Sequence, residues 1–263
     1  RATPHAPRPS ASVMLRRGDE ILVCHRVSTV PSFPDYWAFP GGGVSRADRA
    51  ALDEHPEWFA NRDQDERAAL VALMREMIEE VGIVPGPNGL EQIDVENRMQ
   101  ILQDKTAWHR LVDSGEISIE DEGFVVISER TTPPLAPLRF RNHFFTVECN
   151  VEPILHSDER PEFDEYRWAT PRTLLDEWMA NEIRLPPPLV MILRELLEDT
   201  IENSIARMSS TPPRKNTRIE FGPGVECLPL PTDTLPPSTH TNCYVLGLPG
   251  GDRVIIDPAA KCV

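Results

Sequence analysis

Three carboxylates and one guanidinium lie within a short run that has the pattern of a helix, Arg75-Glu76-Met77-Ile78-Glu79-Glu80-Val81-Gly82-Ile83. At about 100° of rotation per residue, Glu76, Glu79 and Glu80 lie within roughly 100° of one another on the helix surface. Like charges repel at this spacing, so the arrangement favours a divalent cation such as Mg²⁺ among the carboxylates, because such ions take oxygen ligands. The alternative interpretation of an isolated Glu-x-x-Glu-Glu is a solvated acidic face.

A second unusual stretch lies upstream, where the apolar run Trp37-Ala38-Phe39-Pro40 leads into Gly41-Gly42-Gly43. Glycine lets the backbone approach a ligand, a metal or another segment closely. A glycine triplet by itself is more often a turn. If the glycines at 41–43 and the acidic run at 75–83 act together, the helices and strands between them must bring the two stretches close in space.

Hydrophobic periodicity and capping residues predict those elements. The acidic helix begins near Asp63–Asp65, whose carboxylates suit a helix N-terminus, and it ends at Gly82, a good C-cap residue. Strands are predicted at 12–15, 21–26, 124–127, 143–149 and 166–169. Further helices are predicted around 47–60, 90–113 and 171–179, and from the prolines at 186–188 to about 205.

Composition narrows the class of protein. The chain has 263 residues, of which 40% are hydrophobic and 26% charged, as in a globular protein. No run of about 18 apolar residues predicts a membrane span. A net charge of −15 argues against a nucleic-acid polymer as partner. The five scattered cysteines and the absence of an apolar leader favour a reducing cytoplasm, with no signal peptide expected.

The acidic run and the glycines together resemble the Nudix box, the motif of the Nudix hydrolase superfamily. Residues 75–83 match its second half, R-E-U-x-E-E-x-G-U with U apolar, at every defined position, and Phe39-Pro40-Gly41-Gly42 matches its F-P-G-G start. The resemblance implies an α+β fold, an α/β/α sandwich around a mixed sheet. It also implies metal-dependent hydrolysis of a diphosphate linkage in a nucleoside diphosphate joined to a further group.

The spacing within the box departs from the family pattern G-x5-E-x7-R. Arg75 follows Gly42 by 33 positions, which makes this segment 19 residues longer than the pattern. Counted back from Arg75, the upstream acid of the box would fall at Arg67, and the neighbouring Asp65 and Glu66 are the candidates to replace it.

This enlargement is similar to that of the RP2-like (type 19) Nudix subgroup. The stretches 139–145, 165–171 and 185–188 also resemble that subgroup's motifs. The subgroup implies coenzyme A or acyl-CoA as the first expected substrate. The CoA signature of other Nudix enzymes, however, needs Arg and Gly residues upstream of F-P-G-G, and here Arg26 alone fits.

The resemblance also implies roles for individual residues. Glu79 and Glu80 are expected to ligate Mg²⁺ or Mn²⁺, and Glu76 to ligate the ion or orient water. A backbone carbonyl at Gly41 or Gly42 would complete the metal shell. Arg75 would orient a carboxylate by a charge-assisted contact.

A later loop of Nudix enzymes often adds one more acid. Here the loop before Trp168 offers Glu159, Glu162 and Glu165, of which Glu162 is the favoured catalytic candidate. The residues expected to contact substrate are Arg26, Arg139 and Phe39. His143 is interpreted as a packing residue rather than a catalytic one.

The C-terminal segment resembles the start of a different fold. Thr241–Gly247 and Val254–Pro258 are similar to the first strands of the metallo-β-lactamase fold, and the chain stops before that fold's metal-binding motif. We therefore predict a Nudix domain at 1–208, a linker at 209–218 and an incomplete metallo-β-lactamase-like unit at 219–263. His240 is interpreted as a loop residue, and no zinc chemistry is expected here.

Three functional hypotheses remain open at this stage. The first is hydrolysis of CoA derivatives, and the second is hydrolysis of a nucleoside diphosphate sugar or a dinucleotide. The third is a non-catalytic Nudix-like module that binds a ligand for a fused metallo-β-lactamase-fold hydrolase. The first two predict a small phosphorylated substrate, and neither predicts a membrane or a nucleic-acid polymer as partner.

Overall fold

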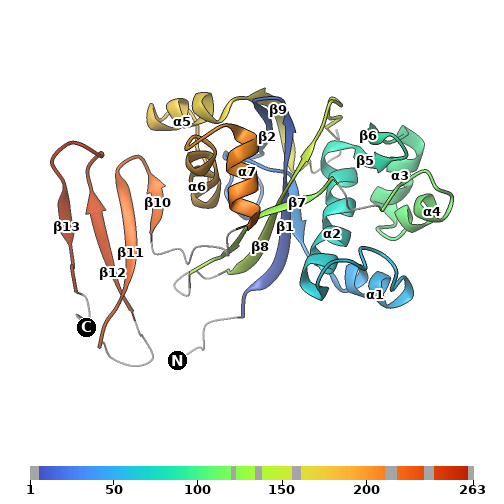
Figure 1. The fold of residues 1–263 in the computed structure, drawn as a ribbon, viewed down its shortest axis with the longest axis horizontal. Helices are drawn as coiled ribbons and strands as arrows, with labels where there is room; N and C mark the ends of the chain where they lie inside the picture. Colours follow the sequence, from blue (N-terminus) through green and yellow to red (C-terminus); the bar gives the residue numbers. More distant parts are fainter. Residues whose placement is uncertain are drawn as a thin grey trace.

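A mixed β-sheet lies at the centre of the molecule and carries helices on both faces (Figure 1). The structure is a computed structural model that describes residues 6–119, 123–133, 138–155, 161–210, 218–233 and 240–259. The strands of this sheet are β1 (Arg8–Arg17), β2 (Glu20–Arg26), β3 (Trp37–Ala38), β4 (Gly41–Gly43), β7 (Val125–Thr131), β8 (Phe140–Glu148) and β9 (Phe163–Ala169). Strand β1 is central, because it pairs with β8 in parallel and with β2 and β4 antiparallel.

The helices form a layer on each side of the sheet. One layer contains α1 (Arg46–Glu54), α2 (Gln64–Glu76), α3 (Val95–Gln103) and α4 (Trp108–Asp113), and the other α5 (Pro171–Met179), α6 (Pro187–Leu196) and α7 (Ile201–Ser210). Successive side chains of β1 point to opposite faces of the sheet, so they pack against the two helical layers in turn. Val13 and Leu15 pack in the core beneath α2, whereas Met14 packs in the core beneath α5 and α6. The mixed α/β sandwich predicted from sequence is confirmed.

Helix α2 and the turn η1 (Met77–Val81) that continues it carry the acidic run, and the two ends of this helical segment follow the predicted capping residues. The Asp63 carboxylate accepts hydrogen bonds from the backbone N–H groups of Asp65 and Glu66, both at 2.9 Å. The last turn, η1, is π-helical, and Gly82 ends it with a left-handed φ of 65°. The prediction of a continuous α-helix to Val81 was therefore wrong in its last turn. Single π-turns of this kind often re-aim side chains at functional sites.

Two predicted long helices are each interrupted. The region 90–113 contains β6 (Gly89–Gln92), which pairs with β5 (Ile83–Gly86), followed by α3 and α4. Asp94 caps the start of α3, and Asp104 terminates it. The final helix is divided into α6 and α7, because Thr200 accepts the backbone N–H of Asn203 and starts a new helix. Short polar residues that compete for backbone groups explain both interruptions.

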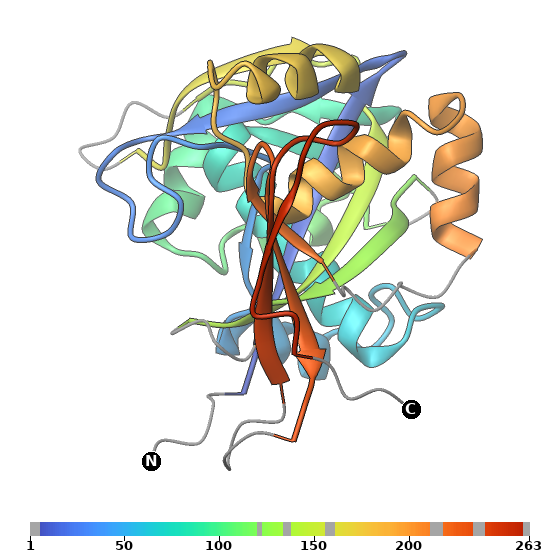
Figure 2. The same cartoon turned by 90° about the vertical axis from the view of Figure 1, so that its left-hand side faces the viewer.

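The C-terminal residues form a separate antiparallel sheet that stands beside α6 (Figures 1 and 2). Its strands are β10 (Ile219–Gly222), β11 (Val225–Pro231), β12 (His240–Leu246) and β13 (Val254–Ile256). The buried carboxylate of Glu220 forms an ion pair with Arg194 of α6, in which Arg194 Nη1 lies 2.6 Å from Glu220 Oε2. Helix α7 extends two residues past the predicted domain end at 208, and most of the predicted linker lies outside the described residues.

None of the helices in the part of the chain that the structure describes has the length and hydropathy of a membrane span.

Candidate active site

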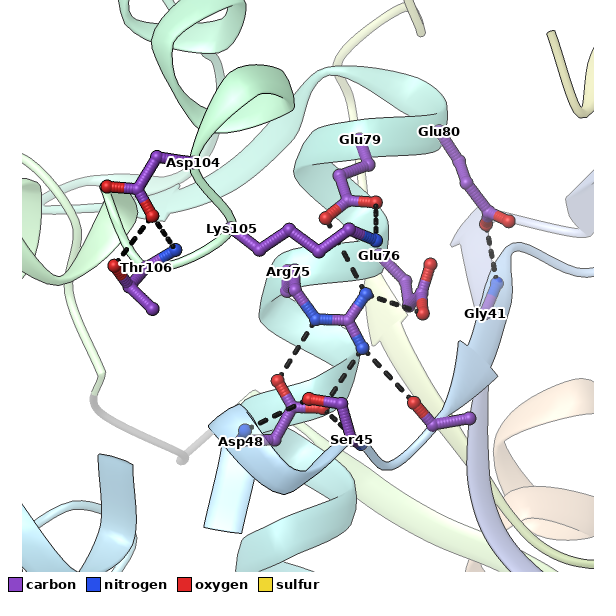
Figure 3. Close-up of polar contacts among 11 residues, drawn as sticks. Gly41, Ser45, Asp48, Arg75, Glu76, Glu79, Glu80, Asp104, Lys105 and Thr106 are labelled. Carbon is purple, nitrogen blue, oxygen red and sulfur yellow. Dashed lines mark hydrogen bonds and ion pairs between the residues drawn. The ribbon is translucent and has the colours of Figure 1, made fainter. Parts of the chain in front are cut away.

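A buried ion pair between Arg75 and Asp48 joins the acidic helix to the segment that follows the glycines (Figure 3). Arg75 Nε donates to Asp48 Oδ1 and Nη2 donates to Asp48 Oδ2, each at 3.0 Å. Nη2 also donates to the Gly43 carbonyl at 3.1 Å. Both side chains are only 3% exposed. Burial opposes ionisation of Asp48, but the contacts with Arg75 outweigh it and lower the pKa of this carboxyl.

Asp48 is the acid that sequence reasoning missed. Counted forward from Gly42, the upstream acid of G-x5-E falls at position 48, whereas counting back from Arg75 points to Arg67. The extra 19 residues therefore follow the box acid. The two candidates proposed instead lie elsewhere, since Asp65 pairs with Arg141 and Glu66 with Arg62. Counting from the glycines, rather than from Arg75, would have identified this residue.

The glycines permit close contact between β4 and the acidic helix. Gly41 has a φ of 146°, and its N–H donates to Glu80 Oε2 at 2.7 Å. A Cβ atom at Gly42 would lie 2.2 Å from Glu76 Oε1, so any larger residue would collide with that carboxylate. The glycines thus give two of the acids their positions. The predicted use of a Gly41 or Gly42 carbonyl as a metal ligand stays a prediction.

The third acid, Glu79, lies in the π-helical turn and is mostly buried at 14% exposure. Its Oε2 is 3.1 Å from Lys105 Nζ, and its Oε1 is 3.6 Å from Arg75 Nη1, beyond normal hydrogen-bond length. Glu76 Oε1 accepts a hydrogen bond from Arg75 Nη1 at 2.7 Å. Arg75 therefore contacts carboxylates on both sides, in agreement with an orienting role.

Two carboxylate oxygens of this cluster are buried without a hydrogen-bond partner, Glu79 Oε1 and Glu80 Oε1. Burial raises the pKa of Glu80 well above its ordinary value, and the charges of Glu162 and Glu76 raise it further. Burial also raises the pKa of Glu76 to about 7, although Arg75 opposes this change. Buried carboxylate oxygens that lack a hydrogen-bond partner are the oxygen donors that a hard divalent cation would satisfy.

The side chains are not already arranged as a closed metal cage. Among the described residues, no three acidic, histidine or cysteine side chains converge closely enough to hold an ion as they stand. The unpartnered oxygens of Glu79 and Glu80 nevertheless fit Mg²⁺ or Mn²⁺ chemically. Glu79 and Glu80 could therefore hold such an ion, and the participation of Glu76 stays a prediction.

The loop before β9 contributes Glu162 to the same region. Glu162 Oε1 lies 2.7 Å from Arg26 Nη1, and the charges of both residues act on Glu80. Two predicted site residues from distant segments are therefore brought to the acidic helix. Glu165 lies exposed on β9 in register with His25, and Glu159 lies outside the described residues.

The other two predicted substrate contacts lie elsewhere. Phe39 is 5% exposed and packs in the core beneath α5 and α6, so the structure gives it a packing role instead. Arg139 precedes β8, where its carbonyl accepts the Arg8 N–H and its Nε donates to the Thr132 carbonyl. Arg8, which is bonded to Arg139, lies four residues along β1 from Ser12, and Ser12 pairs with Gly41 of β4. Phe39 was misassigned because its motif also fits a core anchor.

The two histidines considered at the sequence level lie away from the acidic cluster. His143 is buried on β8, with its Nε2 3.2 Å from Glu129 Oε2, which agrees with a packing role. His240 begins β12 of the C-terminal sheet, so the prediction that it lies in a loop was wrong.

Comparisons with known proteins identify the family that this fold and acidic site define. A family model of the NUDIX domain matches residues 6–187. A Caenorhabditis elegans protein named "Putative nudix hydrolase 7" is 29% identical over 201 residues, which span 72% of this chain and 60% of that protein. The crystal structure of a NUDIX hydrolase from Alicyclobacillus acidocaldarius is 23% identical, with a TM-score of 0.65, covering 83% of this chain and 99% of that one. The chain therefore belongs to the NUDIX family, the class of Nudix hydrolases.

Proposed function

We propose that this chain hydrolyses a diphosphate linkage in a small nucleoside diphosphate-X compound, with Mg²⁺ or Mn²⁺ held by Glu76, Glu79 and Glu80. The observation that carries this proposal is the pair of buried, unpartnered oxygens on Glu79 and Glu80. A binding module has no need of such an arrangement, because a buried carboxylate oxygen without a hydrogen-bond partner destabilises a fold. The net charge of −15 also argues against a nucleic-acid polymer as the substrate.

The chemistry requires water to attack one phosphorus while the bridging P–O bond breaks, which yields two phosphate products. A divalent ion held by these carboxylates would neutralise charge on the diphosphate and would make the attacking water more acidic. Glu162, which is not one of the proposed metal ligands, takes the proton of the attacking water. Arg75 keeps Glu76 in place, and Asp48 in turn fixes Arg75.

Coenzyme A or an acyl-CoA is our first choice of substrate. The enlarged box and the motifs at 139–145, 165–171 and 185–188, similar to those of the RP2-like subgroup, support it. Arg26 is the proposed phosphate contact, because it lies beside Glu162 at the edge of the acidic cluster. A nucleoside diphosphate sugar or a dinucleotide is the alternative, because the arginine and glycine pattern of other CoA-specific Nudix enzymes is incomplete here.

The proposal is tested with a substrate panel and one variant. CoA, NADH, ADP-ribose and nucleoside diphosphate sugars would be incubated with Mg²⁺ or Mn²⁺, and the phosphate products measured. We expect one class to be cleaved, and Glu79→Gln to reduce kcat by about 10²-fold or more because one proposed metal ligand is lost. The control is Glu54→Gln, on the exposed end of α1. Absence of cleavage by the wild type, or full activity of Glu79→Gln, would refute the proposal.

We also propose that residues 219–263 are the first strands of a metallo-β-lactamase-like unit, distinct from the domain at 1–208. The strand pattern of β12 and β13 supports this assignment. The exposed side chains of Val254, Ile255 and Ile256 support it as well, since apolar strand residues are normally covered in a complete fold.

Deletion of residues 211–263 is expected to leave the diphosphatase activity within about twofold of wild type. Among the described residues, the C-terminal sheet meets the first domain chiefly where β10 packs on α6, in the helical layer opposite to α2 (Figure 1), and Arg194 can turn to solvent once Glu220 is removed. Activity and circular dichroism of the shortened protein measure this. Loss of soluble, folded protein would show that the C-terminal sheet belongs to the core of the first domain.

A further inference from the structure

Lys105 is a cation outside the box motif that reaches the acidic cluster (Figure 3). Its Nζ lies 3.1 Å from Glu79 Oε2, yet 59% of its side chain is exposed. An ion pair with such an exposed partner adds little stability. Stability alone therefore gives a weak reason for placing an ammonium at this position.

Hydrogen bonds and buried side chains on both sides of Lys105 define the position of its backbone. Upstream, the buried Arg98 of α3 donates to the Glu79 carbonyl at 2.9 Å and so fixes α3 on the π-helical turn. Asp104 Oδ1 accepts hydrogen bonds from the N–H and the hydroxyl of Thr106, at 3.0 and 2.7 Å, which closes the turn around Lys105. Downstream, Trp108 is fully buried.

The anchor of this turn comes from the inserted segment of the box. Trp108 lies with its ring centroid 5.1 Å from that of Trp58, which follows α1. His55 stacks on Trp58 at 4.1 Å, and His109 packs against both tryptophans. The additional residues of the box therefore support the turn that carries Lys105.

The ammonium also complements the other cation of the site. Arg26 lies on the side of Glu80 and Glu162, whereas Lys105 lies on the side of Glu79. A diphosphate carries negative charge on both of its phosphate groups. Cations on the two sides of the carboxylates could therefore contact one phosphate group each. Lysine is a compact charge on a flexible stem and exchanges partners readily. Lys105 is also the first lysine of the chain, and the lysine and arginine positions before it are all arginine.

We propose that Lys105 is a diphosphate-binding residue, held by Glu79 in the metal-free protein and released to the substrate when Glu79 takes up a divalent cation. This inference rests on the proposed function and assigns to it a residue outside the motif. It predicts two opposite effects of removing the ammonium. Metal binding tightens, because Glu79 loses a competing cation, whereas diphosphate binding weakens.

The test compares Lys105→Met and Lys105→Arg with Arg110→Met, which removes an exposed cation from the neighbouring α4. Calorimetric titration with Mn²⁺ alone is expected to show several-fold tighter binding to Lys105→Met than to wild type. With Mn²⁺ present, the hydrolysis-resistant probe adenosine 5′-(α,β-methylene)diphosphate is expected to bind about tenfold more weakly to Lys105→Met. Lys105→Arg retains most of the probe affinity, and Arg110→Met matches wild type in both titrations.

The outcomes separate this inference from the proposed function. Equal probe binding by wild type and Lys105→Met would overturn the role of Lys105 and leave the proposed hydrolysis standing. Unchanged Mn²⁺ affinity in Lys105→Met would overturn the exchange at Glu79. A wild-type protein that binds Mn²⁺ but no diphosphate would overturn the proposed function together with the inference.

Discussion

Glu80→Gln is expected to lower kcat by about 10³-fold while raising the melting temperature of the metal-free protein by about 2–4 °C. The loss of activity follows from removal of a proposed metal ligand. The gain in stability follows because Glu80 is buried, with Oε1 unpartnered and with Glu76 and Glu162 nearby. Glutamine keeps an oxygen that can accept the Gly41 N–H, so the existing hydrogen bond is retained.

The pH dependence of this gain gives a sharper test. The pKa of Glu80 is raised in the folded protein, chiefly by burial, so between its unfolded and folded pKa values the unfolded chain loses the proton first. The wild type therefore loses stability as pH rises above about 4.5, whereas Glu80→Gln loses less, because only Glu76 still has a raised pKa in this part of the variant. Melting curves with chelator at pH 5 and pH 8 measure the difference. A variant less stable than wild type at pH 8 would contradict this account of the site.

Asp48→Ala is expected to lower the free energy of unfolding by about 3–5 kcal/mol. The substitution leaves the guanidinium of Arg75 buried without its main counter-charge. It also removes the capping box of α1, in which Asp48 accepts the Ser45 N–H at 2.7 Å. For a domain of this size, the melting temperature should fall by roughly 10 °C.

The matched control for Asp48→Ala is Asp53→Ala, on the same helix but exposed, which should change stability by no more than about 0.5 kcal/mol. Urea denaturation followed by circular dichroism measures both variants. Similar midpoints for Asp48→Ala and wild type would show that the ion pair does not organise the box.

The sequence identified the acidic cluster because its residues are contiguous. Glu76, Glu79 and Glu80 are on one turn, so a local period was enough to place them on one face. The same local argument placed the start of α2 near Asp63–Asp65 and the end of the helical segment, which η1 completes, at Gly82. It could not detect the π-helical turn, because that geometry depends on contacts that tertiary packing imposes.

Residues that reach the site from other segments were harder to predict. Asp48 was not predicted because, in the enlarged box, the position of the upstream acid can be counted either from Gly42 or from Arg75. Only the folded chain shows that Arg75 contacts Asp48. Lys105 carries no motif, since it arrives on the turn between α3 and α4. Phe39 shows the reverse error, because an aromatic residue beside glycines fits both a substrate contact and a core anchor.

The stacked aromatic side chains have a consequence for how this chain can vary. Trp58 belongs to the enlarged box and Trp108 to the turn after α3, yet each fills space against the other. Losing either partner would leave a cavity that costs about 3–5 kcal/mol. The two segments therefore behave as one exchangeable module: a chimera that imports the long box from a relative has to import the α3–α4 segment with it.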